Sequence, residues 1–127
     1  MSRYEIFIPV NVPSSKNGKT WTGKRLVWSK SAQKYVKATK TFWEFHQEHF
    51  IRKSAGKALP LKVSFKFIRG TRHKFDYVNP LQTVLDLMVT YGWIPDDNAD
   101  EILPVFEPYE YNKDNPGVVI KVLSDDN

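Results

Sequence analysis

Apolar and basic residues alternate most clearly between Pro60 and Arg69 (PLKVSFKFIR). Leu61, Val63, Phe65 and Phe67 fall on one side of an extended chain, which predicts a strand with one buried face. Shorter apolar segments predict four more strands, at Tyr4–Pro9, Arg25–Trp28, Glu101–Phe106 and Pro116–Leu123. The turn-rich segment Asn11–Gly23 is expected to be a loop.

A helical pattern begins after Ser29 and continues to about Lys53. Ser29 is a favourable N-cap residue because its hydroxyl can accept a hydrogen bond from a free backbone N–H. Apolar and aromatic residues then recur at spacings of three and four, which predicts one buried stripe. The stripe consists of Tyr35, Ala38, Phe42, Phe45 and His49.

A second, shorter helix is expected to begin at Asn79-Pro80, with Asn79 as the N-cap and Pro80 at the first helical position. Gly92 is expected to end it. Its buried face is predicted to hold Leu81, Val84, Leu85 and Met88. At 100° per residue, Asn79, Gln82 and Asp86 share the opposite face.

These elements predict an α+β fold, with a mixed sheet of about five strands and one long and one shorter helix. A chain of 127 residues can bury a core, and we expect residues 1–127 to form a single domain. No run of 18 apolar residues predicts a membrane span, and Met1–Glu5 lacks the apolar stretch of a signal peptide. The absence of cysteine fits the reducing cytoplasm.

Charge is distributed unevenly along the chain. Residues 1–75 hold 17 Lys and Arg against three acids, whereas residues 76–127 hold two against 11. This asymmetry predicts a surface that faces a polyanion and a separate acidic cluster, as a metal-dependent nucleic-acid enzyme requires. The alternative is that the two parts fold together so that opposite charges meet.

The acidic residues of most interest are Asp76 and the Asp96-Asp97-Asn98 segment, which flank the shorter helix. Carboxylates gathered near a strand end are suitable ligands for Mg²⁺, which prefers hard oxygen donors. A bound metal can activate water and stabilise the charge on a phosphate under attack. On composition alone, Asp-Asp-Asn after a helix is also typical of a solvated turn.

The order of these features resembles the RusA family of Holliday junction resolvases along nearly the whole chain. The matching segments are Pro13-Ser14-Ser15-Lys16-Asn17, Val27-Trp28-Ser29, Asp76-Tyr77-Val78-Asn79, Asp86-Leu87-Met88 and Gly92-Trp93-Ile94-Pro95-Asp96-Asp97. The last is the most specific match. The resemblance implies that Asp76 and Asp97 are catalytic and bind metal, with Asp96 or Asp86 assisting, while Asn79 caps the helix beside the site.

Two positions depart from the family pattern. Val78 stands where the family has a second Asp, and Gln82 stands where it has a Lys. Val cannot bind metal, and neutral Gln cannot supply the charge of Lys to a phosphate. Either Asp86 or Asp96 replaces the missing ligand, with Lys74 or Arg72 replacing the charge, or the enzyme is impaired.

The resemblance implies a homodimeric, Mg²⁺-dependent endodeoxyribonuclease, with Mn²⁺ as the alternative metal, that resolves four-way DNA junctions in recombination and repair. Genes of this family are common in prophages. We expect DNA to contact a basic surface, formed by Lys16, Lys19, Lys24, Arg25, Arg69, Arg72, His73 and Lys74. The alternatives are a RusA-like protein that binds branched DNA without cutting it, and an interaction module with no role on DNA.

Other motifs carry less weight. Gly18-Lys19-Thr20 imitates the end of a phosphate-binding P-loop, but the earlier glycine that such a loop requires would fall at Pro13. His46 and His49 lie three residues apart without the HExxH pattern of a zinc site. The tryptophans are expected to lie in the core or an interface, with Trp21 as a candidate base-stacking residue in the basic loop.

Overall fold

The computed structural model describes residues 5–14, 19–21 and 26–124, with the backbone alone for 19–21 and 26–28. The described elements, in chain order, are β1 (Glu5–Pro9), β2 (Lys19–Trp21), β3 (Leu26–Trp28), α1 (Lys30–Ser54), β4 (Leu61–Arg69), α2 (Val78–Thr90), β5 (Ile102–Phe106), β6 (Glu110–Tyr111) and β7 (Gly117–Val122). The fold is α+β, as the sequence pattern predicts. None of the helices in these residues is long and apolar enough to cross a membrane.

The main sheet is mixed and, within the described residues, has five strands in the order β1-β7-β4-β5, with β6 also pairing with β4. β7 lies antiparallel between β1 and β4. β5 and β6 run parallel to β4 along its other edge. β2 and β3 form a separate antiparallel hairpin. The strand β2 lies within the segment that the sequence predicts to be a loop. The strand β6 was not predicted, because its two residues are too few to show an alternation of apolar and polar positions.

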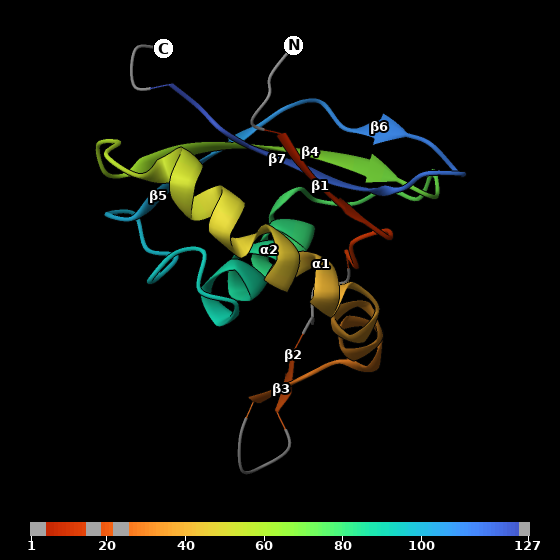
Figure 1. The fold of residues 1–127 in the computed structure, drawn as a ribbon. Helices are drawn as coiled ribbons and strands as arrows, with labels where there is room; N and C mark the ends of the chain where they lie inside the picture. The colour runs from red at the N-terminus through yellow and green to blue at the C-terminus, as the bar shows by residue number, and fades with distance from the viewer. Residues whose placement is uncertain (1–4, 15–18, 22–25, 125–127) are drawn as a thin grey trace.

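Figure 1 shows both helices packed on one face of the sheet, with the β2–β3 hairpin projecting beyond α1. The side chains that alternate toward the helices are buried in β4, including Val63, Phe65 and Phe67. Val118 and Ile120 of β7 and the corresponding residues of β1 continue this layer. The core therefore lies between the sheet and the two helices.

Helix α1 begins as predicted, because the hydroxyl of Ser29 accepts a hydrogen bond from the backbone N–H of Ala32 at 3.2 Å. Its predicted buried stripe is confirmed at Tyr35, and His49 is partly buried, but the stripe is wrong at its other three residues. Phe42 and Phe45 are 40% and 79% exposed, and Ala38 is also exposed. The residues that contact the core are Ala32, Tyr35, Thr39, Trp43 and Phe50. Both faces of α1 carry aromatic residues, so local spacing does not determine which face is buried.

Helix α2 begins earlier than predicted. Tyr77 occupies the N-cap position without a side-chain capping bond in the described structure, and Asn79 lies inside the helix. The backbone carbonyls of Asp76 and Tyr77 accept hydrogen bonds from Asn79 and Leu81. Pro80 fits the first turn because N–H groups there have no helical partner to lose. The prediction that Asn79 is the helix cap is therefore corrected.

The rest of α2 agrees with the sequence pattern. Its buried residues include the four predicted ones, Leu81, Val84, Leu85 and Met88. Gly92 follows the helix at a φ of 76°, a conformation that glycine adopts without strain. The backbone N–H of Trp93 then bonds to the carbonyl of Met88 at 2.8 Å, which closes the C-terminal turn.

Candidate nucleic-acid site

A cavity of about 550 Å³ opens where the segment between β4 and α2 passes the connection between β5 and β6. Its lining combines cations, one carboxylate, two tyrosines and small polar groups. The lining residues are Ser14, Arg72, His73, Lys74, Phe75, Asp76, Tyr77, Asn79 and Tyr109. The cavity thus joins the basic turn and the first part of the acidic motif that the sequence singles out.

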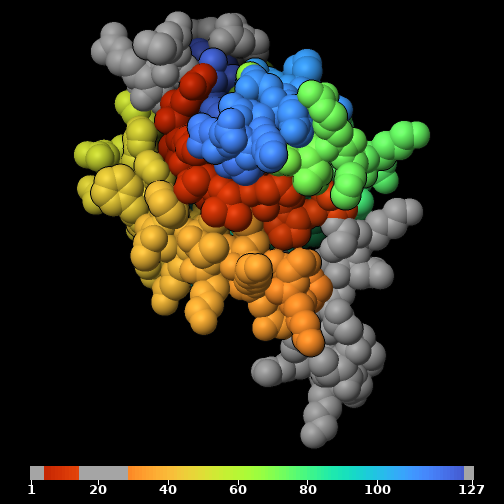
Figure 2. Space-filling view, turned by 90° about the vertical axis from the view of Figure 1, so that its right-hand side faces the viewer, coloured from red at the N-terminus to blue at the C-terminus, as the bar shows by residue number. Residues whose placement is uncertain are grey.

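Three chain segments are held together at this end of the sheet. Figure 2 shows residues 70–75 (green), the connection around β6 (blue) and the segment after β1 (red) side by side on one face. The backbone N–H of Gly70 bonds to the side-chain oxygen of Asn11 at 2.8 Å, and the N–H of Asn112 bonds to the carbonyl of Arg69. These bonds anchor the loop that carries the basic side of the cavity.

Arg69 was predicted to contact DNA from the surface, but it is buried, with 3% exposure. It is therefore not available for such a contact. Its guanidinium donates hydrogen bonds to the carbonyl of Val12 at 2.7 Å and to the hydroxyl of Ser14 at 2.9 Å. It also lies 4.5 Å from the centre of the Phe75 ring. Burial lowers the pKa of Arg69 from its ordinary value, yet an arginine remains charged at neutral pH. Arg69 therefore holds Ser14 and Phe75, which both line the cavity, in place from the protein interior.

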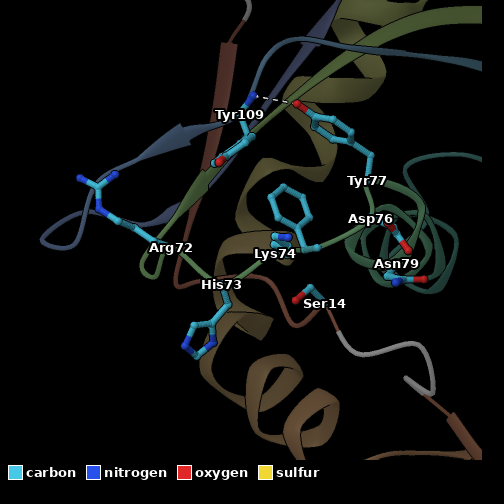
Figure 3. Close-up of a pocket in the computed structure, with 9 residues that line it drawn as sticks. Ser14, Arg72, His73, Lys74, Asp76, Tyr77, Asn79 and Tyr109 are labelled. Carbon is cyan, nitrogen blue, oxygen red and sulfur yellow. Dashed lines mark hydrogen bonds between the residues drawn. The ribbon is translucent and has the colours of Figure 1, made fainter.

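Asp76 and Asn79 lie beside each other at the beginning of α2, with Ser14 nearby (Figure 3). The carboxylate of Asp76 is exposed, whereas Asn79 is partly buried. Asp76 is the one acidic residue in the described lining. Asp76, which the motif resemblance predicts to be catalytic, thus lines a cavity whose other titratable side chains include the basic residues Arg72, His73 and Lys74.

Arg72, His73 and Lys74 form the basic side of the cavity, and all three are exposed. The guanidinium of Arg72 lies 3.9 Å from the centre of the Tyr111 ring, which orients it by a cation–π contact. Lys19 contributes its backbone to β2, and Lys16, Lys24 and Arg25 lie outside the described residues. The structure therefore brings Arg72 and Lys74 to the candidate site, together with His73.

The cavity is completed by an aromatic wall, which consists of Phe75, Tyr77 and Tyr109. This wall was not predicted from the sequence. Phe75, Tyr77 and Tyr109 contact one another, with ring centres 5.1 Å apart for Phe75 and Tyr109 and 5.4 Å for Phe75 and Tyr77. The hydroxyl of Tyr77 accepts a hydrogen bond from the backbone N–H of Tyr109 at 3.0 Å. The signal available in the sequence was the Phe-Asp-Tyr order around Asp76, but Tyr109 lies 32 residues from Tyr77.

The remaining acidic candidates are not part of the cavity lining. Asp96 accepts hydrogen bonds from the backbone N–H of Asp97 at 2.8 Å and from the side-chain amide of Asn98 at 2.9 Å. The first of these bonds is the main reason that the pKa of Asp96 is lowered. Asp97 is partly buried in the same turn. On α2, Asp86 accepts a hydrogen bond from Gln82 at 3.0 Å, which confirms that these two residues share a face.

The cavity offers hard oxygen donors suited to Mg²⁺, namely the carboxylate of Asp76 and the side-chain amide oxygen of Asn79. Mg²⁺ usually keeps several waters and takes one or two carboxylates together with phosphate oxygens of a substrate. Among the described residues, no group of three or more acidic, His or Cys side chains is placed to hold a metal ion. The donors present therefore fit a metal held by Asp76 and by the substrate.

The chain matches no protein-family model, and no curated protein sequence matches it.

Proposed function

We propose that this protein is a metal-dependent endodeoxyribonuclease that acts on branched DNA at the Asp76 cavity. The proposal includes a homodimer acting on four-way junctions in recombination and repair, and a cytoplasmic location. It combines the motif resemblance to RusA resolvases with the composition of the cavity. The observation that carries it is that Asp76, the first catalytic residue of that motif, lines one cavity together with Arg72, His73 and Lys74.

The chemistry of these residues supports a phosphodiester substrate. Arg72 and Lys74 can attract and hold phosphate oxygens, and such contacts position DNA without reading its sequence. Asp76 and Asn79 offer oxygen ligands at the same place. Mg²⁺, when bound, would stabilise the negative charge that develops on the phosphate. Asp76 would hold the metal, while Lys74 supplies the positive charge that Gln82 lacks.

The experiment that tests this function compares a labelled four-way junction with a linear duplex of the same length, in Mg²⁺ and in Mn²⁺. We expect tighter binding to the junction and paired, symmetric nicks in its arms. Equal binding and equal cutting of the two DNAs would contradict the structure selectivity. Failure to bind either DNA at low salt would contradict the function as a whole and favour an interaction module.

A second candidate is a RusA-like protein that binds branched DNA without cutting it. The observation that favours it is Val78, which is 64% exposed between the cavity residues Tyr77 and Asn79. The family has a metal-binding Asp at this position, and an isopropyl group cannot replace that ligand. Tight junction binding without cleavage in either metal would support this candidate over the nuclease.

Lys74 offers a test of the phosphate contact. We expect Lys74→Gln to weaken junction and duplex binding alike, because a phosphate contact is independent of sequence and structure. The slope of log K against log salt should fall in magnitude by about 1, the contribution of one phosphate. Fluorescence anisotropy over a range of salt concentrations measures this slope.

The matched control is Lys37→Gln, which removes an exposed lysine from α1, outside the cavity lining. Its salt slope should equal that of the wild type. If both variants change the slope equally, DNA contacts the basic residues of α1 as much as the cavity, and the assignment of the phosphate contact to Lys74 is wrong.

A further inference from the structure

The cavity is larger and more aromatic than a phosphate contact alone requires. Its volume of about 550 Å³ falls within the range of pockets that enclose small organic ligands. The backbone of a duplex can be held by exposed cations on a convex or flat surface. A concave, partly open space with an aromatic wall instead suits a ligand that has a flat, apolar part in addition to its charge.

Tyr109 is the residue of this wall that is best placed to meet such a part. Its side chain is 50% exposed, although it packs edge-on against Phe75 at an interplanar angle of 84°. Its backbone is fixed by the hydrogen bond to the Tyr77 hydroxyl, shown as a dashed line in Figure 3. Tyr77 in turn packs against Phe106 of β5 at 5.0 Å. A half-exposed ring held in this way loses little freedom when a flat ligand stacks on it.

The basic side of the same cavity can bind the charged part of the ligand. Lys74 belongs to the loop that precedes Asp76, and it lines the cavity together with Tyr109. A nucleotide has both features, a flat base and a charged phosphate. Bases stack on tyrosine with little dependence on sequence. An unpaired nucleotide is easier to place in a pocket than a paired one, because no base pair has to be broken.

We propose that the cavity takes one unpaired nucleotide of a branched DNA, with its base against Tyr109 and its phosphate toward Lys74. This inference rests on the proposed DNA-binding function and adds the form of DNA that the site recognises. Tyr77 and Phe75 act as positioning residues, since they hold Tyr109 from its sides. Recognition of the base by stacking makes the site tolerant of sequence.

The test compares three DNAs of equal length by fluorescence anisotropy. These are a fully paired duplex, the same duplex with one central unpaired nucleotide, and that second duplex with an abasic sugar-phosphate in place of the unpaired nucleotide. The wild type should bind the unpaired nucleotide more tightly than the other two DNAs. Tyr109→Ala should reduce this preference by roughly 5- to 150-fold, the range that corresponds to the free energy lost when a stacking residue is truncated.

Two variants serve as controls. Tyr109→Phe keeps the ring and should keep the preference. Phe45→Ala removes an exposed aromatic residue from α1, outside the cavity lining, and should also keep it. Equal affinity of the wild type for the unpaired and abasic DNAs, or an unchanged preference in Tyr109→Ala, would overturn the inference while leaving junction binding intact. Loss of binding to all three DNAs and to the four-way junction would instead contradict the proposed function.

Discussion

Replacing Trp43 by alanine is expected to destabilise the protein by about 3–5 kcal/mol, the range for removing a fully buried aromatic side chain. Trp43 has 0% exposure, and its ring packs against Trp93 at 5.1 Å. Its indole N–H donates to the hydroxyl of Thr39, which itself donates to the carbonyl of Tyr35. The substitution leaves a cavity between α1 and the residues that follow α2, and it removes the donor to Thr39.

Equilibrium unfolding in urea measures this change in the free energy of unfolding. Phe45→Ala is the control, because Phe45 lies on the same helix with 79% exposure. Its effect should remain within about 0.5 kcal/mol, as is usual for surface substitutions. If Phe45→Ala cost as much as Trp43→Ala, the face of α1 predicted from the sequence would be the buried one, and the packing described here would be wrong.

Replacing Gly117 by alanine should cost about 3 kcal/mol or more, at the upper end for overpacking. Gly117 is the buried first residue of β7 and pairs with Pro9 of β1 and Ile68 of β4. An added Cβ would overlap the carbonyl oxygen of Ile8 and approach the Phe7 ring to 2.7 Å. The Ile8 oxygen belongs to the backbone of a paired strand and cannot move without disturbing the ladder.

Gly70→Ala is the matched control for this substitution. Its added Cβ would approach Pro116 no closer than 3.4 Å, which is ordinary contact. We expect a change within about 1 kcal/mol, in either direction. Thermal unfolding of both variants compares them directly. Similar losses in the two variants would contradict the close approach of β1 and β7 at Gly117.

The main elements could be predicted from local signals. The alternation from Leu61 to Phe67 predicted the central strand β4 because one of its faces is buried, whereas the residues of the other face, apart from Ser64, are only partly buried. The Ser29 cap and Gly92 marked the ends of α1 and α2 because capping depends on residues close in the chain. These are the cases in which one or two neighbouring residues supply the physical reason.

Arg69 and the face of α1 required long-range information. Arg69 is in phase with Leu61, Val63, Phe65 and Phe67, so the register of β4 directs it inward. Because Arg69 is charged, the sequence predicted it to lie on the surface. The groups that bind its guanidinium, Val12 and Ser14, are 57 and 55 residues away. The burial of Trp43 and Phe50 likewise depends on Trp93, which comes from a distant segment.

The candidate site was predicted in part. Asp76, Asn79, Arg72 and Lys74 line one cavity because they lie within eight residues of each other at the end of β4. Tyr109 reaches the cavity through the parallel pairing of β5 and β6 with β4, which no local pattern encodes. The roles of Asp97, Asp96 and Asp86 in metal binding remain predictions from the motif.

The most direct test of the central claim is cleavage of a labelled four-way junction in Mg²⁺ by the wild type, Asp76→Asn and Asp97→Asn. The control is Asp114→Asn, an exposed acid in the turn before β7, outside the cavity. We predict paired nicks by the wild type and the control, and a loss of at least about 100-fold in Asp76→Asn, because the amide cannot supply a charged metal ligand. Asp97 lies outside the cavity lining, and only the motif resemblance predicts the same loss in Asp97→Asn. Retained cleavage in Asp97→Asn alone would remove Asp97 from the site. Retained cleavage in Asp76→Asn would contradict the account.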